Sequence, residues 1–195
     1  MGKFITDAEI ASKAKEYGIE EAALRAVMDV ECKGRGFNDD GTPVILFERH
    51  KFYNGLIAIN WVTKAKEWAK LYPDICNPTW GGYGKESAQH GRLQRASALN
   101  RDVALASASW GLGQVLGENW KDLGYKSLQS FINAMYKDEV SQLDAMCRFI
   151  KHNGLIKHIQ NKDWAKFARA YNGPKYAENK YDTKLAAAYK KNGGK

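Results

Sequence analysis

Apolar residues recur along most of the chain at intervals of three and four, the spacing of one face of an α-helix. This pattern predicts helices over residues 6–17, 20–32, a stretch around 61–68 that ends at Pro73, 86–107, 128–135, 140–150, 164–171 and the tail from Tyr181. At the start of the first helix, Thr6 and Glu9 have the spacing of a capping box, in which each side chain bonds the other residue's backbone. The chain is therefore predicted to be mainly helical.

One segment breaks the helical pattern. Residues 43–47 read PVILF, a β-prone run, and the NDDG just before them is typical of a turn. We predict a short strand or hairpin there. Residues 74–84, DICNPTWGGYG, are predicted to form a loop because they are rich in Asn, Pro and Gly. No internal repeat or long linker is visible, so the fold class is predicted to be mainly α with a small β element (α+β), in a single domain over residues 1–195.

Composition narrows the class of protein. Hydrophobic residues make up 44% of the 195 residues, enough for a core. No apolar run approaches the ~20 residues of a membrane-spanning helix. The segment Met1 to Asp7 lacks the apolar core of a signal peptide, so synthesis in the cytoplasm is expected. The three cysteines, Cys32, Cys76 and Cys147, are odd in number and far apart, and we expect reduced core thiols.

The charge points to an anionic partner. The net charge is +8 and the pI is about 9.3, which suits nucleic acid, anionic lipid or bacterial cell wall equally. No helix-turn-helix or RNA-recognition signature is present, so no specific nucleic acid is expected. The four histidines show no zinc-binding spacing, and the GGYGKES stretch has Glu86 where a phosphate-binding loop needs Ser or Thr. We therefore expect no metal and no cofactor.

A glutamate lies on the apolar side of the helix predicted over residues 20–32. Leu24, Val27 and Met28 share one helical face, and Glu31 continues it. Apolar surroundings and the nearby helix C-terminus both disfavour a carboxylate, so both should raise the pKa of Glu31, as a general acid requires. The alternative is a rotated helix that leaves Glu31 in solvent. We interpret Glu31 as a catalytic acid.

A second candidate carboxylate, Glu48, directly follows the apolar run VILF. Glycoside hydrolysis needs one carboxyl that donates a proton and one that stays ionised, and the end of a strand could place Glu48 at the edge of a cleft. The alternative is an ordinary ion pair with Arg49. Asp39 and Asp40 compete for the second role, but NDDG is more simply explained as a turn.

Two further motifs combine glycine, aromatic and amide side chains. In SASWGLGQVLG, residues 107–117, Gly111 and Gly113 permit close approach of a ligand, and Trp110 beside Gln114 offers a flat face for a sugar ring. The alternative is a turn that starts a helix and is packed by Trp110.

The second of these motifs is ARAYNGP, residues 168–174. Its glycine and proline are explained by helix capping, because Gly just past a helix end and Pro after it are common stop signals. Capping does not explain Tyr171 and Asn172, which we therefore interpret as candidate site residues.

Five segments, in this order, resemble the N-acetylmuramidase domain of bacteriophage endolysins, a lysozyme-like family. They are AVMDVECKGRGF, PVILFERHKFY, CNPTWGGYG, SASWGLGQVLGENWKDLGY and FARAYNGPKYAENKYDTKLAAAY. The likeness covers nearly the whole chain. More distantly, Glu31, SWGLGQ and AYNG are similar to elements of goose-type lysozymes and soluble lytic transglycosylases.

The resemblance implies cleavage of the β-1,4 bond between N-acetylmuramic acid and N-acetylglucosamine in peptidoglycan. It implies that Glu31 is the catalytic acid and Glu48 the second candidate carboxylate. Cys32 stands where the family often has Ser, which bears on packing around the acid. The residues implied to line the sugar cleft are Ser109, Trp110, Gly111, Gln114, Tyr171 and Asn172.

The resemblance also implies partners and a location. The expected substrate is bacterial peptidoglycan, with anionic cell-envelope polymers attracted by the basic charge, and the protein is expected to be a monomer without a separate wall-binding module. A protein made in the host cytoplasm would reach the wall through a pore in the inner membrane. Two alternatives stay open: a lytic transglycosylase that forms 1,6-anhydro products, and a non-catalytic, basic wall-binding domain.

Overall fold

The structure is a computed structural model of the chain, and it describes residues 3–31 and 35–195. The chain is mainly helical with a small antiparallel sheet, which confirms the predicted fold class. It divides into two compact units. The first unit comprises Met1–Thr42, Gly111–Gly113 and Lys137–Lys195, and the second comprises Pro43–Trp110 and Gln114–Tyr136.

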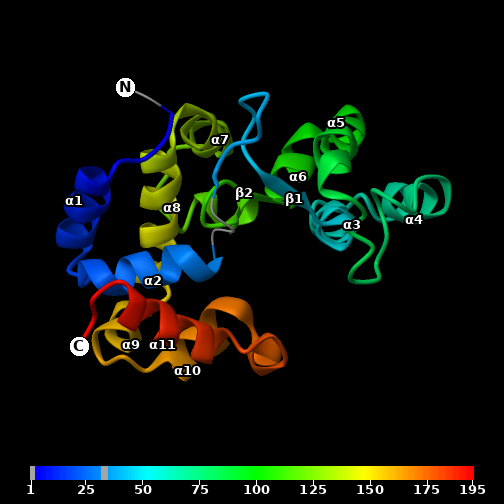
Figure 1. Cartoon of the computed structure of the whole chain (residues 1–195). Helices are drawn as coiled ribbons and strands as arrows, with labels where there is room; N and C mark the ends of the chain where they lie inside the picture. The colour runs from blue at the N-terminus through cyan, green and yellow to red at the C-terminus, as the bar shows by residue number, and fades with distance from the viewer. Residues whose placement is uncertain (1–2, 32–34) are drawn as a thin grey trace. The chain divides into compact units, whose positions relative to one another are not determined.

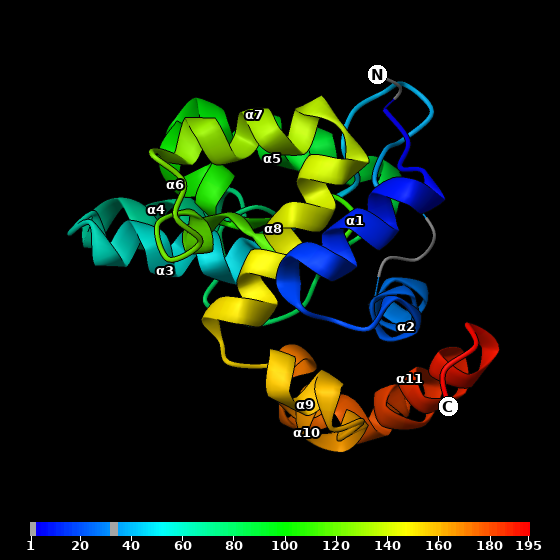
Figure 2. The same cartoon turned by 90° about the vertical axis from the view of Figure 1, so that its left-hand side faces the viewer.

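The first unit is all helical in its described part. Its helices are α1 (Asp7–Tyr17), α2 (Glu21–Glu31), α8 (Glu139–His152), α9 (Ile156–Gln160), α10 (Trp164–Asn172) and α11 (Tyr181–Lys191), with a 3-10 turn η3 (Pro174–Asn179). Helices α2 and α11 lie side by side (Figures 1 and 2), and α2 also packs on α1. Fully buried side chains from α2, α8, α10 and α11 form its core: Leu24, Val27, Leu143, Met146, Ile150, Phe167 and Leu185.

Two predictions from the sequence concern the helices α1 and α2 of this unit. The capping box at the start of α1 is confirmed, because Thr6 Oγ1 accepts from the Glu9 N–H and Glu9 Oε2 accepts from the Thr6 N–H. The helix predicted over residues 20–32 is described over Glu21–Glu31. Its predicted last residue, Cys32, lies outside the described residues.

The second unit combines helices with the sheet. Its elements are β1 (Ile45–Phe47), α3 (Arg49–Ala58), α4 (Val62–Leu71), η1 (Glu86–Ala88), α5 (Gln89–Leu99), α6 (Arg101–Ala106), β2 (Ala108–Trp110), β3 (Val115–Leu116), η2 (Gly117–Trp120) and α7 (Leu128–Lys137). The sheet is antiparallel with the order β1-β2-β3, and Ser109 of the central strand pairs with Leu46 and Leu116. Figure 1 shows α3 and α4 side by side, and the two helices are in contact.

The short strand predicted within residues 43–47 is confirmed as β1, which pairs with β2 much later in the chain. The SASWGLGQVLG segment forms the β2–β3 turn, and the 3-10 turn η2 begins at its last residue, Gly117. The prediction of one helix over residues 86–107 was wrong, because the helix breaks at Asn100, where the backbone is extended. The Asn100 side chain then caps α6 by accepting a hydrogen bond from the Val103 N–H.

The structure shows the state of two cysteines and the character of the helices in the described residues. Cys76 and Cys147 are buried free thiols, as predicted, and burial raises the pKa of Cys76 to about 11 and that of Cys147 to about 12. Cys32 lies outside the described residues. Within residues 3–31 and 35–195, no helix has both the length and the apolar character needed to cross a membrane.

Candidate active site

Glu31 is the last residue of α2 and belongs to the first unit. The preceding turns bury Leu24 and Val27 completely, so the helix cannot rotate Glu31 into solvent without exposing them. The Glu31 side chain is partly buried, and its Oε1 accepts a hydrogen bond of 2.9 Å from Nδ2 of Asn172, at the end of α10. Glu31 and Asn172 are 141 positions apart in the chain, and the fold brings these two predicted site residues together.

The electrostatic surroundings of Glu31 favour its protonated form. Burial raises the pKa of Glu31 to about 7, against the opposing effects of the Asn172 hydrogen bond and the charge of Lys184. The α2 C-terminus acts in the same direction as burial, because the carbonyl end of a helix carries partial negative charge. The predicted direction of the pKa shift is therefore confirmed. A carboxyl with a pKa near 7 can both hold and release a proton at neutral pH, as a general acid must.

Tyr171 fixes the end of α10 beside Asn172. Its ring stacks on Phe167 with centroids 5.4 Å apart and meets Phe149 edge-on at 5.5 Å. Its hydroxyl donates to the carbonyl of Gly113 at 3.0 Å. Tyr171 thus braces the helix end that presents the Asn172 amide to Glu31.

The two glycines of the SASWGLGQVLG motif have a different role from the one predicted. Gly111 has a φ of +63°, and a Cβ on it would lie 2.5 Å from Cδ of Gln142; a Cβ on Gly113 would lie 2.6 Å from Cβ of Met146. Both neighbours belong to α8. The prediction that Gly111 and Gly113 make room for a ligand was therefore wrong, since α8 occupies that space.

The prediction that Trp110 stacks on a sugar ring was also wrong. Trp110 is 1% exposed, its indole N–H donates to the Leu105 carbonyl at 3.1 Å, and its ring packs on Tyr136. These contacts make it a core residue of the second unit. A flat apolar ring suits a core as well as a binding surface, so residue type alone could not separate the two roles.

Glu48 occupies the N-cap position of α3, directly after β1 in the second unit. Its side chain is only 15% exposed. Oε1 accepts from the Ser109 hydroxyl at 3.4 Å, the Tyr83 hydroxyl also bonds the carboxyl, and Nε2 of His50 lies 3.7 Å from Oε2. The fold thus joins two predicted site residues, Glu48 and Ser109. Sequence reasoning missed Tyr83.

The pKa of the Glu48 carboxyl is also raised. Burial is the largest cause, and it outweighs Lys51 and the hydrogen bonds from Ser109 and Tyr83, which act to lower the pKa. Arg49, the partner expected in the alternative interpretation, instead donates to the carbonyls of Gly81 and Pro73, at 2.8 and 3.0 Å. Among the described residues, no ion pair joins Glu48 to Arg49.

The remaining candidates have structural surroundings. Gln114 has a φ of +46°, and its Nε2 donates to the Val44 carbonyl at 3.4 Å. Asp40 Oδ1 accepts from the Thr42 N–H at 2.9 Å, and the side chain of Asp39 is fully exposed, so NDDG is the predicted turn. Within the described part of the chain, no group of three or more His, Cys, Asp or Glu side chains could hold a metal ion.

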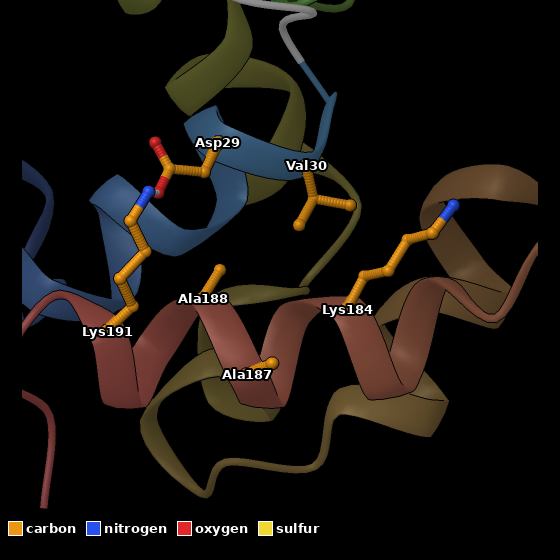
Figure 3. Close-up of a pocket in the computed structure, with 6 residues that line it drawn as sticks. All are labelled: Asp29, Val30, Lys184, Ala187, Ala188 and Lys191. Carbon is orange, nitrogen blue, oxygen red and sulfur yellow. Dashed lines mark ion pairs between the residues drawn. The ribbon is translucent and has the colours of Figure 1, made fainter.

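An open hollow of about 510 Å³ lies between α2 and α11, close to Glu31 in sequence (Figure 3). Its lining residues are Asp29, Val30, Lys184, Ala187, Ala188 and Lys191. Lys191 pairs with Asp29 at 3.6 Å, whereas the Lys184 side chain extends away from that pair (Figure 3). Three of the six lining residues are small or apolar, and the charged groups do not converge on one point.

Comparison with known proteins places this chain in a family. The model of the N-acetylmuramidase family matches residues 20–193. The crystal structure of a Burkholderia AP3 phage endolysin shares 40% sequence identity, with a TM-score of 0.91, over 99% of this chain and 73% of that one. No curated protein matches the chain. The chain belongs to the N-acetylmuramidase family, and membership defines its class as a peptidoglycan hydrolase.

Proposed function

We propose that this chain cleaves the β-1,4 bond between N-acetylmuramic acid and N-acetylglucosamine in peptidoglycan, with Glu31 as the general acid. The observation that carries the proposal is the state of that carboxyl: partly buried at the C-terminus of α2, hydrogen-bonded by Asn172, with a pKa of about 7. The family and the phage endolysin relative supply the substrate class.

In the proposed reaction Glu31 gives its proton to the glycosidic oxygen as the bond to C1 of N-acetylmuramic acid breaks. The bonding electron pair leaves with that oxygen, and positive charge develops at C1 and the ring oxygen. Asn172 is a proposed positioning residue, because its amide holds one oxygen of the Glu31 carboxyl.

Glu48 is proposed as the second, ionised carboxyl. It would either take a proton from the water that attacks C1, which inverts the anomer, or bond to C1 itself before water releases the sugar, which retains it. Ser109 and Tyr83 hold this carboxyl by hydrogen bonds, so they are proposed positioning residues.

The other predicted cleft residues divide into two groups. Tyr171 and Gln114 keep a proposed place in the site, Tyr171 through the α10 end that it braces and Gln114 through its position in the β2–β3 turn. Trp110 and Gly111 leave the set, because their surroundings are protein core.

The test is digestion of purified peptidoglycan, followed by turbidity and by mass spectrometry of the released muropeptides. Release of fragments with reducing N-acetylmuramic acid ends is the expected result. Fragments with 1,6-anhydro ends would instead identify a lytic transglycosylase, in which the sugar's own 6-hydroxyl attacks C1. Binding to peptidoglycan without any release would identify a wall-binding domain.

A further inference from the structure

The loop that joins α4 to η1, residues 73–85, has no regular secondary structure but is firmly held. Two arginines bind its backbone. Arg49 donates to the carbonyls of Pro73 and Gly81, and Arg92, itself only 7% exposed, donates to those of Asp74, Gly82 and Tyr83. A charged donor bonded to several carbonyls is strongly oriented, so this loop is built to keep one conformation.

Glycines allow the backbone of the loop to close on Arg49. Gly81, Gly82 and Gly84 have φ values of +87°, +68° and +69°, a region that other residues rarely adopt. A Cβ on Gly82 would lie 2.4 Å from Cζ of Arg49. The backbone of the WGGYG segment thus lies against Arg49 at Gly82.

This firmly held loop presents a tryptophan to solvent. Trp80 is 69% exposed, and its ring stands edge-on to Tyr83, with centroids 5.6 Å apart and an interplanar angle of 88°. The Trp80 indole and the Glu48 carboxyl both lie near enough to the Tyr83 hydroxyl to affect its pKa, which burial raises to about 12. Tyr83 is therefore a neighbour of both the exposed indole and Glu48.

Leaving an indole in water forfeits the stabilisation that its burial would give, and ordering it in advance lowers the entropy lost on binding a ligand. We infer that Trp80 is a stacking platform for an aminosugar ring of the peptidoglycan glycan strand, next to Glu48. The C–H face of such a ring fits against an indole face. This inference rests on the proposed function, which supplies the glycan and the role of Glu48.

Trp61 provides the matched control. It is 42% exposed and belongs to the same unit, but its ring packs edge-on against Trp68 instead of Tyr83. A variant of Trp61 therefore removes an exposed indole of the same unit without touching the proposed platform.

The experiment measures binding of the tetramer of N-acetylglucosamine by calorimetry, with Glu31→Gln present in every protein to prevent turnover. Trp80→Ala should weaken binding about 3- to 10-fold, the range expected for loss of an aromatic stacking contact. Trp80→Phe, which keeps a ring but lacks the N–H, should retain most of the affinity. Trp61→Ala should bind like the parent protein.

Two outcomes overturn the inference: Trp80→Ala binding as well as Trp61→Ala, or Trp80→Phe losing as much affinity as Trp80→Ala. The second outcome would make the indole N–H a positioning group for Tyr83 and Glu48. Melting temperatures of the variants identify any loss of folding, and Trp80→Phe tests the ring even if Trp80→Ala is unstable.

Failure of the inference is distinct from failure of the proposed function. Wild-type protein that leaves peptidoglycan intact refutes the function, whatever the tetramer data show. Wild-type protein that cleaves peptidoglycan, together with a Trp80→Ala variant whose KM and tetramer affinity are unchanged, refutes the platform alone.

Discussion

Glu31 and Glu48 occupy opposite ends of their helices. Glu31 is the last residue of α2, where the carbonyl end of the helix disfavours negative charge. Glu48 is the N-cap of α3, where the free N–H groups of the first turn favour it. Burial raises the pKa of both carboxyls, so position on the helix is a difference that would help to separate the proposed acid, Glu31, from the proposed ionised carboxyl, Glu48.

Their immediate neighbours widen this difference. Glu31 has the neutral Asn172 amide as its hydrogen-bond donor, and the positive charge that acts on it comes from Lys184. Glu48 is bonded by two hydroxyls and has the charge of Lys51 nearby. Two residues of one type can thus take opposite roles because the fold gives them different surroundings.

The largest expected effect comes from removing the acid. Glu31→Gln keeps the shape of the side chain and can still accept from Asn172, but it cannot release a proton. Peptidoglycan cleavage should fall by about 10²–10⁴-fold, the usual contribution of general acid catalysis. Glu21→Gln, on the same helix, is the control and should keep full activity. A Glu31→Gln rate above one tenth of wild type would exclude Glu31 as the acid.

Glu48→Gln should reduce the rate by about 10²-fold, the lower end of the range for a group that takes part in proton transfer. The fold should survive, because Ser109 and Tyr83 can still bond the amide. Glu67→Gln, which changes an exposed carboxyl of the same unit that pairs with Lys64, is the control. Turnover and melting temperature are measured on each variant. A larger loss of melting temperature than of rate would make Glu48 a structural residue.

The rate should fall about tenfold between pH 6 and pH 8, because a pKa of about 7 leaves most of Glu31 protonated at the lower pH and little at the higher. Asn172→Ala removes a hydrogen bond that favours the carboxylate, so the pKa of Glu31 should rise. The alkaline limb, which is the fall in rate at high pH, should then move to higher pH in this variant. Lys184→Met should move it in the same direction. The check is kcat/KM against pH for the three proteins. A limb that moves to lower pH in either variant would contradict the assignment to Glu31.

Ionisation of Glu31 should lower the stability of the fold as well as the rate. The folded-state pKa lies above the ordinary value of 4.5, so the folded chain holds a proton that the unfolded chain has released. Stability present below pH 4.5 is therefore lost as the pH rises to about 7. Glu31→Gln escapes this loss and should gain relative to wild type between pH 4 and pH 8, by roughly 3 kcal/mol at most. Urea unfolding at both pH values measures it, and an unchanged difference would refute the raised pKa.

Sequence periodicity predicted those helices whose apolar faces are pronounced. It identified α2, α7 and α10, whereas α1 buries only Ile10 and Ala14 and had the capping box as an additional signal. It missed α3, where Phe52 and Leu56 are the buried residues among ten. It also missed the pairing of the sheet, because Ile45 meets Trp110 through contacts far apart in the chain and the strands have three residues or fewer.

The sequence predicted those features of the candidate site that depend on residues close together in the chain. The apolar face of α2 identified the perturbation of Glu31, whereas the Asn172 partner depends on α10 being folded against it. The choice between Trp110 and Trp80 needed the exposed fraction of each side chain, 1% and 69%, and nothing in the residue type supplies it. Tyr83 was missed because its neighbours suggested only a loop.

The smallest expected effect is that of salt on activity. It distinguishes the chemistry of the two carboxyls from the attraction of the basic protein to the cell wall. The hydrogen-bond donors of Glu31 and Glu48 act over short distances on carboxyls that are each partly buried, so added salt should change the chemical step little. A net charge of +8 acts over longer distances, and the Debye length shrinks from about 10 Å at 0.1 M salt to about 3 Å at 1 M. Activity on whole cell walls should therefore fall several-fold across that range, while activity on a short, uncharged oligosaccharide of N-acetylglucosamine should change much less. An equal response on both substrates would mean that the basic charge does not hold the protein to anionic wall polymers.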